Sequence, residues 1–95
     1  MKKIYIVIKD WAYEYDQSIE VVGVFYTEEK AKKCLNDLYE SEAKIEFDDC
    51  EFVDEDKAKE GDYVCYKTDT SIDIFQMGEY TVNHYHCYII DKEIE

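Results

Sequence analysis

Five stretches of the chain predict β-strands, either because their side chains alternate with a period of two or because they are rich in β-branched and aromatic residues. The first stretch is apolar at every position from Ile4 to Ile8, so both of its faces would be apolar, which is typical of a central strand. We expect the first two strands to pair as an antiparallel hairpin with a long connection. The five stretches are residues 3–9, 19–26, 62–67, 71–77 and 79–90.

Between the second and third stretches, apolar residues recur with a period near 3.6 instead of two. Thr27 is a suitable N-cap, and Glu28 and Glu29 would lie in a first turn, where the helix dipole favours anions. The apolar positions that follow recur every three or four residues and form one stripe. This pattern predicts a helix at about residues 28–42.

The predicted order β-β-α-β-β-β indicates an α+β fold. We expect one antiparallel sheet of four to six strands, with one main helix packed on one face. A chain of 95 residues has room for one core, so residues 1–95 are predicted to form a single domain. The residues predicted for that core are Ile4, Ile6, Ile8, Val22, Val24, Phe25, Leu35, Leu38, Val64, Ile74 and Ile89.

The charge of the chain narrows its possible partners. There are 24 Asp and Glu residues against 11 cations, and the formal net charge is −13. A basic patch for direct binding to nucleic acid or to an anionic membrane is therefore not expected. The hydrophobic fraction of 46% is too high for a disordered acidic tail. A folded acidic protein of this kind fits a partner that is itself basic.

The chain shows no signal for export. The apolar run that begins at Ile4 stops at Lys9, which is too short for a signal peptide, and no stretch approaches the ~20 apolar residues of a membrane span. We therefore expect a cytoplasmic location. In a reducing compartment the four cysteines would be free thiols. They are Cys34, Cys50, Cys65 and Cys87, and no CxxC motif is present.

Carboxylates are densest in residues 46–62, which we call the acidic segment. An ordinary solvated loop is one interpretation of it. A calcium loop is set aside, because Ala58 and Lys59 occupy positions where such a loop needs an oxygen ligand and a glycine. A third interpretation is that the carboxylates meet the Lys and Arg of a basic partner, as a phosphate backbone would. The predicted partner-binding residues are Glu46, Asp48, Asp49, Glu51, Asp54, Glu55, Asp56, Glu60, Asp62, Asp69, Asp73 and Glu79.

A histidine pair near the end of the chain suggests an alternative. On a strand, His84 and His86 would project from the same face, ~6–7 Å apart, and Cys65 on a neighbouring strand could add a ligand. The alternative function is then a small regulatory domain that binds a metal or small ligand there. Because no CxxC or HExxH spacing is present, we predict no metal and no cofactor.

Catalytic motifs are missing from the sequence. Ser18, Ser41 and Ser71 lack the flanking glycines of a nucleophile elbow, and three glycines cannot build a phosphate-binding loop. No pair of acids stands out as a general acid and base. We therefore expect that the protein is not an enzyme.

The stretch from Val21 to Ala31, VVGVFYTEEKA, follows an apolar N-terminal strand. In this it resembles a group of short phage and Firmicute proteins that carry a strand, a cap and a helix in the same pattern, and to which no activity is assigned. In size and charge the whole chain is similar to small acidic phage-encoded inhibitors of bacterial defence, such as anti-CRISPR and DNA-mimic proteins. The absence of Arg beside ten Tyr also points to AT-rich codons and a low-GC host.

These features lead to one functional hypothesis. The chain is predicted to be a phage or mobile-element protein that binds and inhibits a basic, nucleic-acid-binding host defence protein in the bacterial cytoplasm. It would act as a monomer or homodimer by competition, without touching nucleic acid or membrane itself.

Overall fold

The structure is a computed structural model that describes residues 2–13, 16–47, 51–78 and 83–94. Its strands and main helix follow one another in the predicted order, β-β-α-β-β-β. The elements are β1 (Lys2–Tyr13), β2 (Asp16–Phe25), α1 (Glu28–Leu38), the π-helical turn η1 (Tyr39–Ala43), α2 (Lys44–Glu46), the 3₁₀ turn η2 (Glu55–Lys57), β3 (Tyr63–Lys67), β4 (Ser71–Gln76) and β5 (His84–Ile94).

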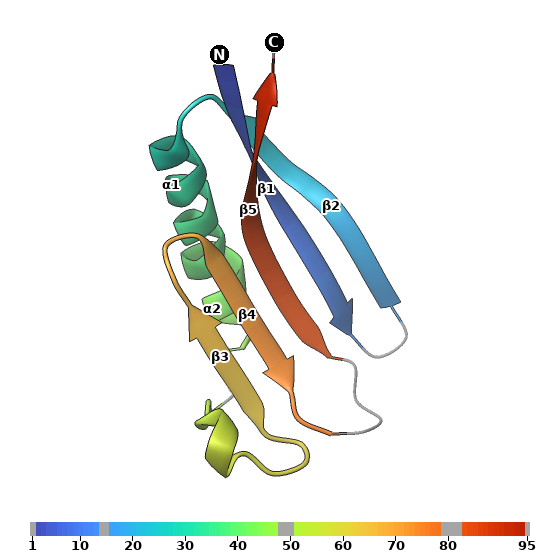
Figure 1. Cartoon of the computed structure of the whole chain (residues 1–95). Helices are drawn as coiled ribbons and strands as arrows, with labels where there is room; N and C mark the ends of the chain where they lie inside the picture. Colours follow the sequence, from blue (N-terminus) through green and yellow to red (C-terminus); the bar gives the residue numbers. More distant parts are fainter. Residues whose placement is uncertain (1, 14–15, 48–50, 79–82, 95) are drawn as a thin grey trace.

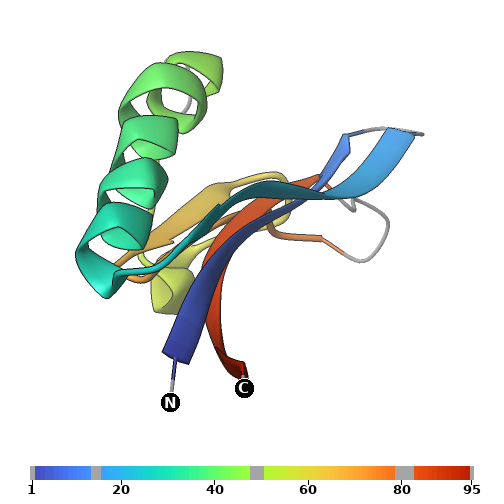
Figure 2. The ribbon, with the colours of Figure 1, turned by 90° about the horizontal axis from the view of Figure 1, so that it is seen from above.

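All the strands belong to one antiparallel sheet, in the order β2-β1-β5-β4-β3. The first and last strands are therefore direct neighbours in the middle of the sheet (Figure 1). The helical segment lies against one face only, as the view from above shows (Figure 2). This arrangement confirms the predicted α+β class.

The helix begins where its cap was predicted. Thr27 has an extended backbone, and its side chain accepts a hydrogen bond from the amide of Lys30 at 3.3 Å. The helical segment continues beyond the predicted end at residue 42 and reaches Glu46, passing through the π-helical turn. In the middle of that turn, the hydroxyl of Ser41 donates to the carbonyl oxygen of Asp37 at 2.6 Å. Such bonds to the preceding turn compete with the regular ladder and bend helices, which accounts for the wider turn.

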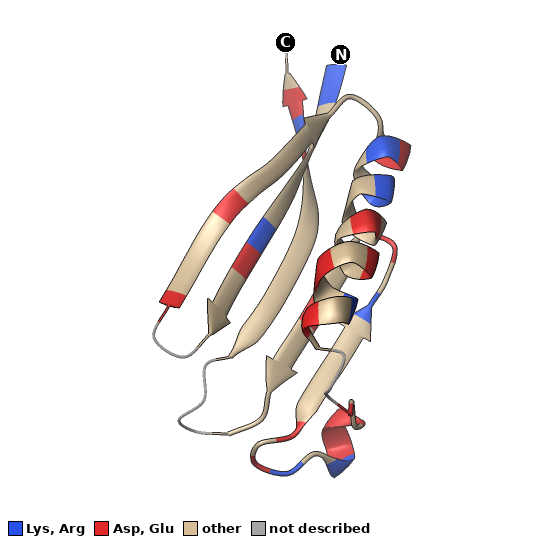
Figure 3. Ribbon diagram, turned by 180° about the vertical axis from the view of Figure 1, so that it is seen from behind, with Lys and Arg blue, Asp and Glu red and all other residues tan. Residues whose placement is uncertain are grey.

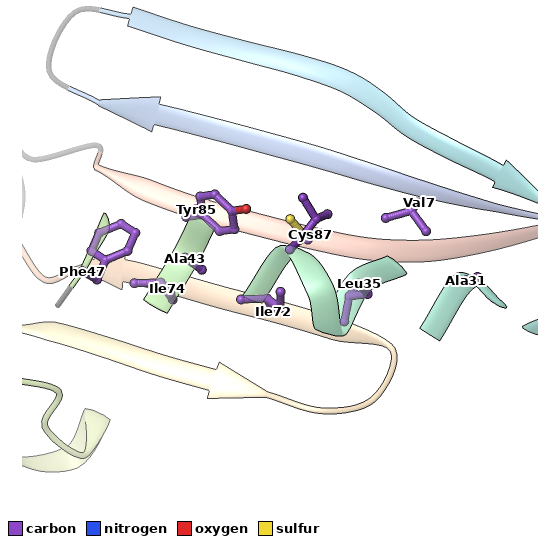
Figure 4. Close-up of a cluster of buried hydrophobic side chains, with 10 residues drawn as sticks. Val7, Ala31, Leu35, Ala43, Phe47, Ile72, Ile74, Tyr85 and Cys87 are labelled. Atoms are coloured by element: carbon purple, nitrogen blue, oxygen red, sulfur yellow. The ribbon is translucent and has the colours of Figure 1, made fainter. Parts of the chain in front are cut away.

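The core lies between the helical segment and the sheet (Figure 4). Leu35 and Val7 are fully buried there, one from each layer. Of the residues predicted for the core, Leu35, Leu38, Val64 and Ile74 are buried, and Phe25 and Ile89 pack against the buried cluster. The buried cluster consists of Val7, Ala31, Leu35, Leu38, Ala43, Phe47, Ile72, Ile74, Tyr85 and Cys87.

The prediction was wrong for the other apolar residues of the first two strands. Val7 lies under the helix with no exposed surface, so strand alternation turns Ile4, Ile6 and Ile8 to the opposite face, where they are only half-buried. Val24 pairs with Ile6 on that face and is 54% exposed. Val22 is also exposed, beside the helix. A continuous apolar run indicates two covered faces, but this chain has one helical layer and covers only one of them.

The first hairpin is longer and tighter than expected. Strand pairing continues to Tyr13 opposite Asp16, so the predicted long connection is wrong. The alternating aromatic and polar residues after Asp10 extend β1 to Tyr13. A β-bulge interrupts the register between Val7 and Ile8, and Gly23 lies opposite Val7.

Candidate partner-binding surface

The acidic segment is held against the edge of the sheet. Phe52 forms a parallel bridge with Tyr63 of β3, and the amide of Val53 donates to the carbonyl oxygen of Tyr63 at 3.0 Å. At the other end of the segment, the amide of Gly61 donates to the carbonyl oxygen of Met77 at 2.8 Å. The positive φ of 94° at Gly61 is one that other residues rarely adopt. Residues 51–62 are therefore anchored at both ends.

The carboxylates of this anchored stretch point to solvent and have no cationic partner. Within the described parts of the acidic segment, Lys57 and Lys59 form no ion pair with any of these acids. Glu55 accepts a hydrogen bond from the hydroxyl of Tyr66, and Asp62 accepts one from the amide of Lys59 at 2.9 Å. The exposed acids are Glu46, Glu51, Asp54, Glu55, Asp56 and Glu60, and Asp62 is half-buried.

A groove runs beside these carboxylates. Its volume is about 610 Å³, and Val53 and Val64 give it an apolar lining, with Tyr66 alongside. Asp54, Glu55 and Asp56 line the same groove. Apolar and acidic surfaces therefore occur together, which suits a Lys or Arg side chain with its aliphatic stem and cationic tip.

The remaining predicted partner-binding residues do not all join this surface. Asp69 lies in the β3–β4 turn, 3.7 Å from the Nζ atom of Lys32, and the length of β3 separates it from residues 51–62. Asp73 pairs in register with Tyr66 and lies near the groove, on the sheet face away from the helix. Asp48, Asp49 and Glu79 lie outside the described residues.

Further exposed acids, which the sequence analysis did not single out, lie on the helical segment. Asp37 and Glu40 are exposed on α1 and η1. Figure 3 shows acidic positions along the C-terminal half of the helical segment, and others in residues 51–62. The signal was present as acidic positions between the apolar ones of the helix. It was overlooked because these acids are spaced along a helix instead of following one another.

One acid of the same turn points inward. Glu42 accepts a hydrogen bond from the Nζ atom of Lys9, whose side chain is only 14% exposed, and another from the hydroxyl of Tyr85 at 3.3 Å. Burial works against the charge of Lys9 and is the largest influence on it, but Glu42 more than offsets this and raises the pKa of Lys9. This cluster joins the sheet to the helix.

The histidines and the cysteine of the metal alternative lie on different faces of the sheet. His84 pairs with Phe75 and its Nε2 atom lies 3.3 Å from Oδ1 of Asp10, on the face away from the helix. Cys65 packs against the core under the helix, so it cannot bind the same metal ion as that histidine. Among the described residues, no three His, Cys, Asp or Glu side chains are grouped closely enough to hold a metal ion.

The described thiols are poorly suited to nucleophilic chemistry. Cys34, Cys65 and Cys87 form no disulfide. Burial raises the pKa of all three, and that of Cys87 to about 11, so each is protonated at neutral pH.

Comparison with protein-family models, with curated proteins and with solved structures gave no match. In the described ranges, none of the helices has the length and apolar character needed to cross a membrane.

Proposed function

We propose that this protein is a non-enzymatic inhibitor whose acidic segment occupies a basic, nucleic-acid-binding surface of another protein. One observation carries the proposal: the described carboxylates of the acidic segment are anchored to the sheet yet form no ion pair with the lysines around them. Acids that serve only to balance nearby lysines would be paired with them. These remain available to a partner.

The mechanism is competition for phosphate-binding side chains. Lys and Arg residues that neutralise phosphates release counterions, and a fixed array of carboxylates offers them the same exchange. Each exposed charge contributes little by itself, but together the charges steer association and make it sensitive to salt. The groove lined by Val53, Val64 and Tyr66 adds the apolar contact that charge alone does not provide.

The class of partner follows from the size, charge and codon bias of the chain. A short acidic protein without arginine is similar to inhibitors that phages and mobile elements use against bacterial defence. We therefore propose a host defence protein that grips DNA or RNA, such as a CRISPR effector, as the target.

The test combines capture with displacement. The full chain is immobilised and exposed at low salt to lysate of a low-GC bacterium, and the retained proteins are challenged with duplex DNA and with single-stranded RNA. A target of the proposed kind is released by nucleic acid and loses its own nucleic-acid binding when the acidic protein is added. If no retained protein is displaced by either nucleic acid, the proposal fails.

A pair of matched variants assigns the surface. One variant changes Asp54, Glu55 and Asp56 to Asn, Gln and Asn. The control removes three exposed carboxylates elsewhere, with Asp16→Asn, Glu29→Gln and Glu93→Gln, so both variants lose the same charge. We expect the first to weaken target binding at least tenfold and the control less than threefold. Equal effects would show that net charge alone drives binding and that the acidic segment is not the interface.

A further inference from the structure

The sheet face away from the helix, which we call the open face, is mainly apolar. In the middle of this face Ile6 is flanked by Val24 of β2 and Ile90 of β5, which are 54% and 42% exposed. Towards the β2 edge, Ile19 and Val21 are 71% and 61% exposed. A protein with a net charge of −13 thus leaves contiguous apolar surface on its central strands.

The area of this face suits a stable dimer. Four strands, β2, β1, β5 and β4, spaced about 4.8 Å apart and each about eight residues long, cover roughly 500 Å² in projection. Accessible area exceeds the projected area because side chains form ridges. A standard interface buries about 800 Å² on each partner, whereas the largest apolar patch of a typical monomer spans about 300–600 Å².

The few charges of the open face are balanced and divided between its two ends. Alternation along β1 and β5 gives the face two cations at one end, Lys2 and Lys92, which have no ion-pair partner among the described residues. At the other end lie two acids, Asp10 and Asp73. Along β1 the order is Lys2, Ile4, Ile6, Ile8, Asp10, with Ile6 at the centre.

We propose that the open face binds a second copy of the same chain. In the dimer the two sheets pack face to face around a two-fold axis that runs across the strands near Ile6. This symmetry brings the cationic end of each copy onto the acidic end of the other, with Lys2 facing Asp10, and buries the isoleucines between them. A two-fold axis that runs along the strands would instead bring the lysines of one copy onto the lysines of the other, and the aspartates onto the aspartates.

The large net charge agrees with this choice of face. Two copies repel each other wherever acids predominate, as they do on the helical side and in the acidic segment. Across β2, β1, β5 and β4 the open face has two lysines and two aspartates, so two copies can meet over these four strands without a local excess of like charge, whereas the acidic segment borders the face at the β3 edge, beside Tyr66. The dimer would carry both helical segments on its outer sides.

Sedimentation equilibrium of the full chain tests the proposal. We expect a species of twice the 11.4 kDa of one chain, and a dimer that weakens at least tenfold in an Ile90→Lys variant. Ile45→Lys is the matched control, because Ile45 is 67% exposed on α2, away from the sheet. Val24→Lys serves as a second variant should Ile90→Lys fail to fold. A monomer at concentrations up to about 1 mM overturns the proposal, and so do equal effects of Ile45→Lys and the open-face variants.

A charge exchange tests the orientation. Lys2→Glu and Asp10→Lys should each weaken the dimer about three- to tenfold, and the two together should recover most of the loss because the contact re-forms with reversed signs. Additive losses in the double variant would contradict the two-fold axis across the strands.

Salt separates this inference from the proposed function. Raising the salt concentration screens the repulsion between two copies and should strengthen the dimer, whereas it should weaken binding to a basic partner. The proposed dimer and the proposed inhibitor function can therefore be disproved independently of each other. If the chain stays monomeric and the Ile90→Lys variant instead loses a captured protein, the open face belongs to that protein and not to a second copy.

Discussion

Lys9 of β1 and Glu42 of the π-helical turn form a hydrogen-bonded ion pair that connects the sheet to the helix across 33 residues of sequence. The same carboxylate also accepts from the hydroxyl of Tyr85 on β5. The wider turn matters here, because it sets the position of Glu42 on the helical segment. The pair therefore fixes how the end of the helical segment sits on the two central strands.

Removal of the Glu42 carboxylate is expected to destabilise the fold. Among the described residues, a Glu42→Ala variant leaves the poorly exposed ammonium of Lys9 with one ion-pair partner, Glu20 at 3.6 Å, so we expect a loss of about 1.5–3 kcal/mol in the free energy of unfolding. Urea denaturation measures it. Glu40→Ala is the control, because Glu40 forms an exposed pair with Lys44 that should contribute less than about 0.5 kcal/mol. Similar losses in both variants would contradict a special role for Glu42.

Stability is expected to fall in mildly alkaline solution. Burial raises the pKa of Cys87 from 9.0 to about 11, so between these values the unfolded chain loses the thiol proton while the folded chain keeps it. The stabilisation is present in full below about pH 9 and is lost as the pH rises towards 11, at a cost of about 3 kcal/mol. Urea midpoints at pH 8, 9 and 10 under reducing conditions should show the decline. Cys87→Ala should make the decline between pH 9 and 10 shallower; an unchanged slope would assign the decline to the other thiols whose pKa is raised, Cys34 and Cys65.

The two faces of the sheet should respond differently to truncation. Leu35 is fully buried under the helix, and Leu35→Ala is expected to cost about 2–5 kcal/mol. Val24 on the open face is 54% exposed, so Val24→Ala should cost less than about 1 kcal/mol at concentrations where the chain is monomeric. Thermal unfolding of dilute samples measures both. Comparable losses would mean that the open face is part of the core.

The helix cap gives a smaller and separate test. Thr27→Ala removes the hydroxyl that accepts from the amide of Lys30, and we expect a loss of about 1 kcal/mol. Thr27→Ser keeps the acceptor and should retain most of the stability. If serine and alanine lower the unfolding midpoint equally, the hydroxyl is not acting as a cap.

The elements that depend on local pattern were predictable from the sequence. Thr27 and the stripe through Leu35 place the start and buried side of the helix, because capping and helical periodicity involve residues within a few positions of one another. The end of the helix was missed, since the π-helical turn depends on Ser41 and on distant contacts of Glu42. The sheet order was also beyond local pattern, since any antiparallel order satisfies the same alternation.

The candidate site was predictable as composition but not as a surface. The acidic segment is visible as a run of carboxylates, whereas its anchoring to Tyr63 and its groove depend on β3 lying beside it. Asp69 is close to the segment in sequence but lies at the far end of β3. The open face was mistaken for core because the apolar run around Ile6 does not reveal how many layers cover the sheet.

The pairing of β1 with β5 has a consequence for how the chain folds. Lys2 lies opposite Ile94, so the two central strands are those farthest apart in the sequence, and their contacts raise the contact order. Closing so long a loop costs entropy before any cross-strand contact repays it, which slows folding relative to a fold built from local hairpins. On the ribosome, the β1–β2 hairpin and the helix emerge first, and the inner edge of β1 stays unpaired until β5 is made. During that interval the nascent chain exposes an apolar strand edge, the kind of surface on which chaperones act and aggregates start.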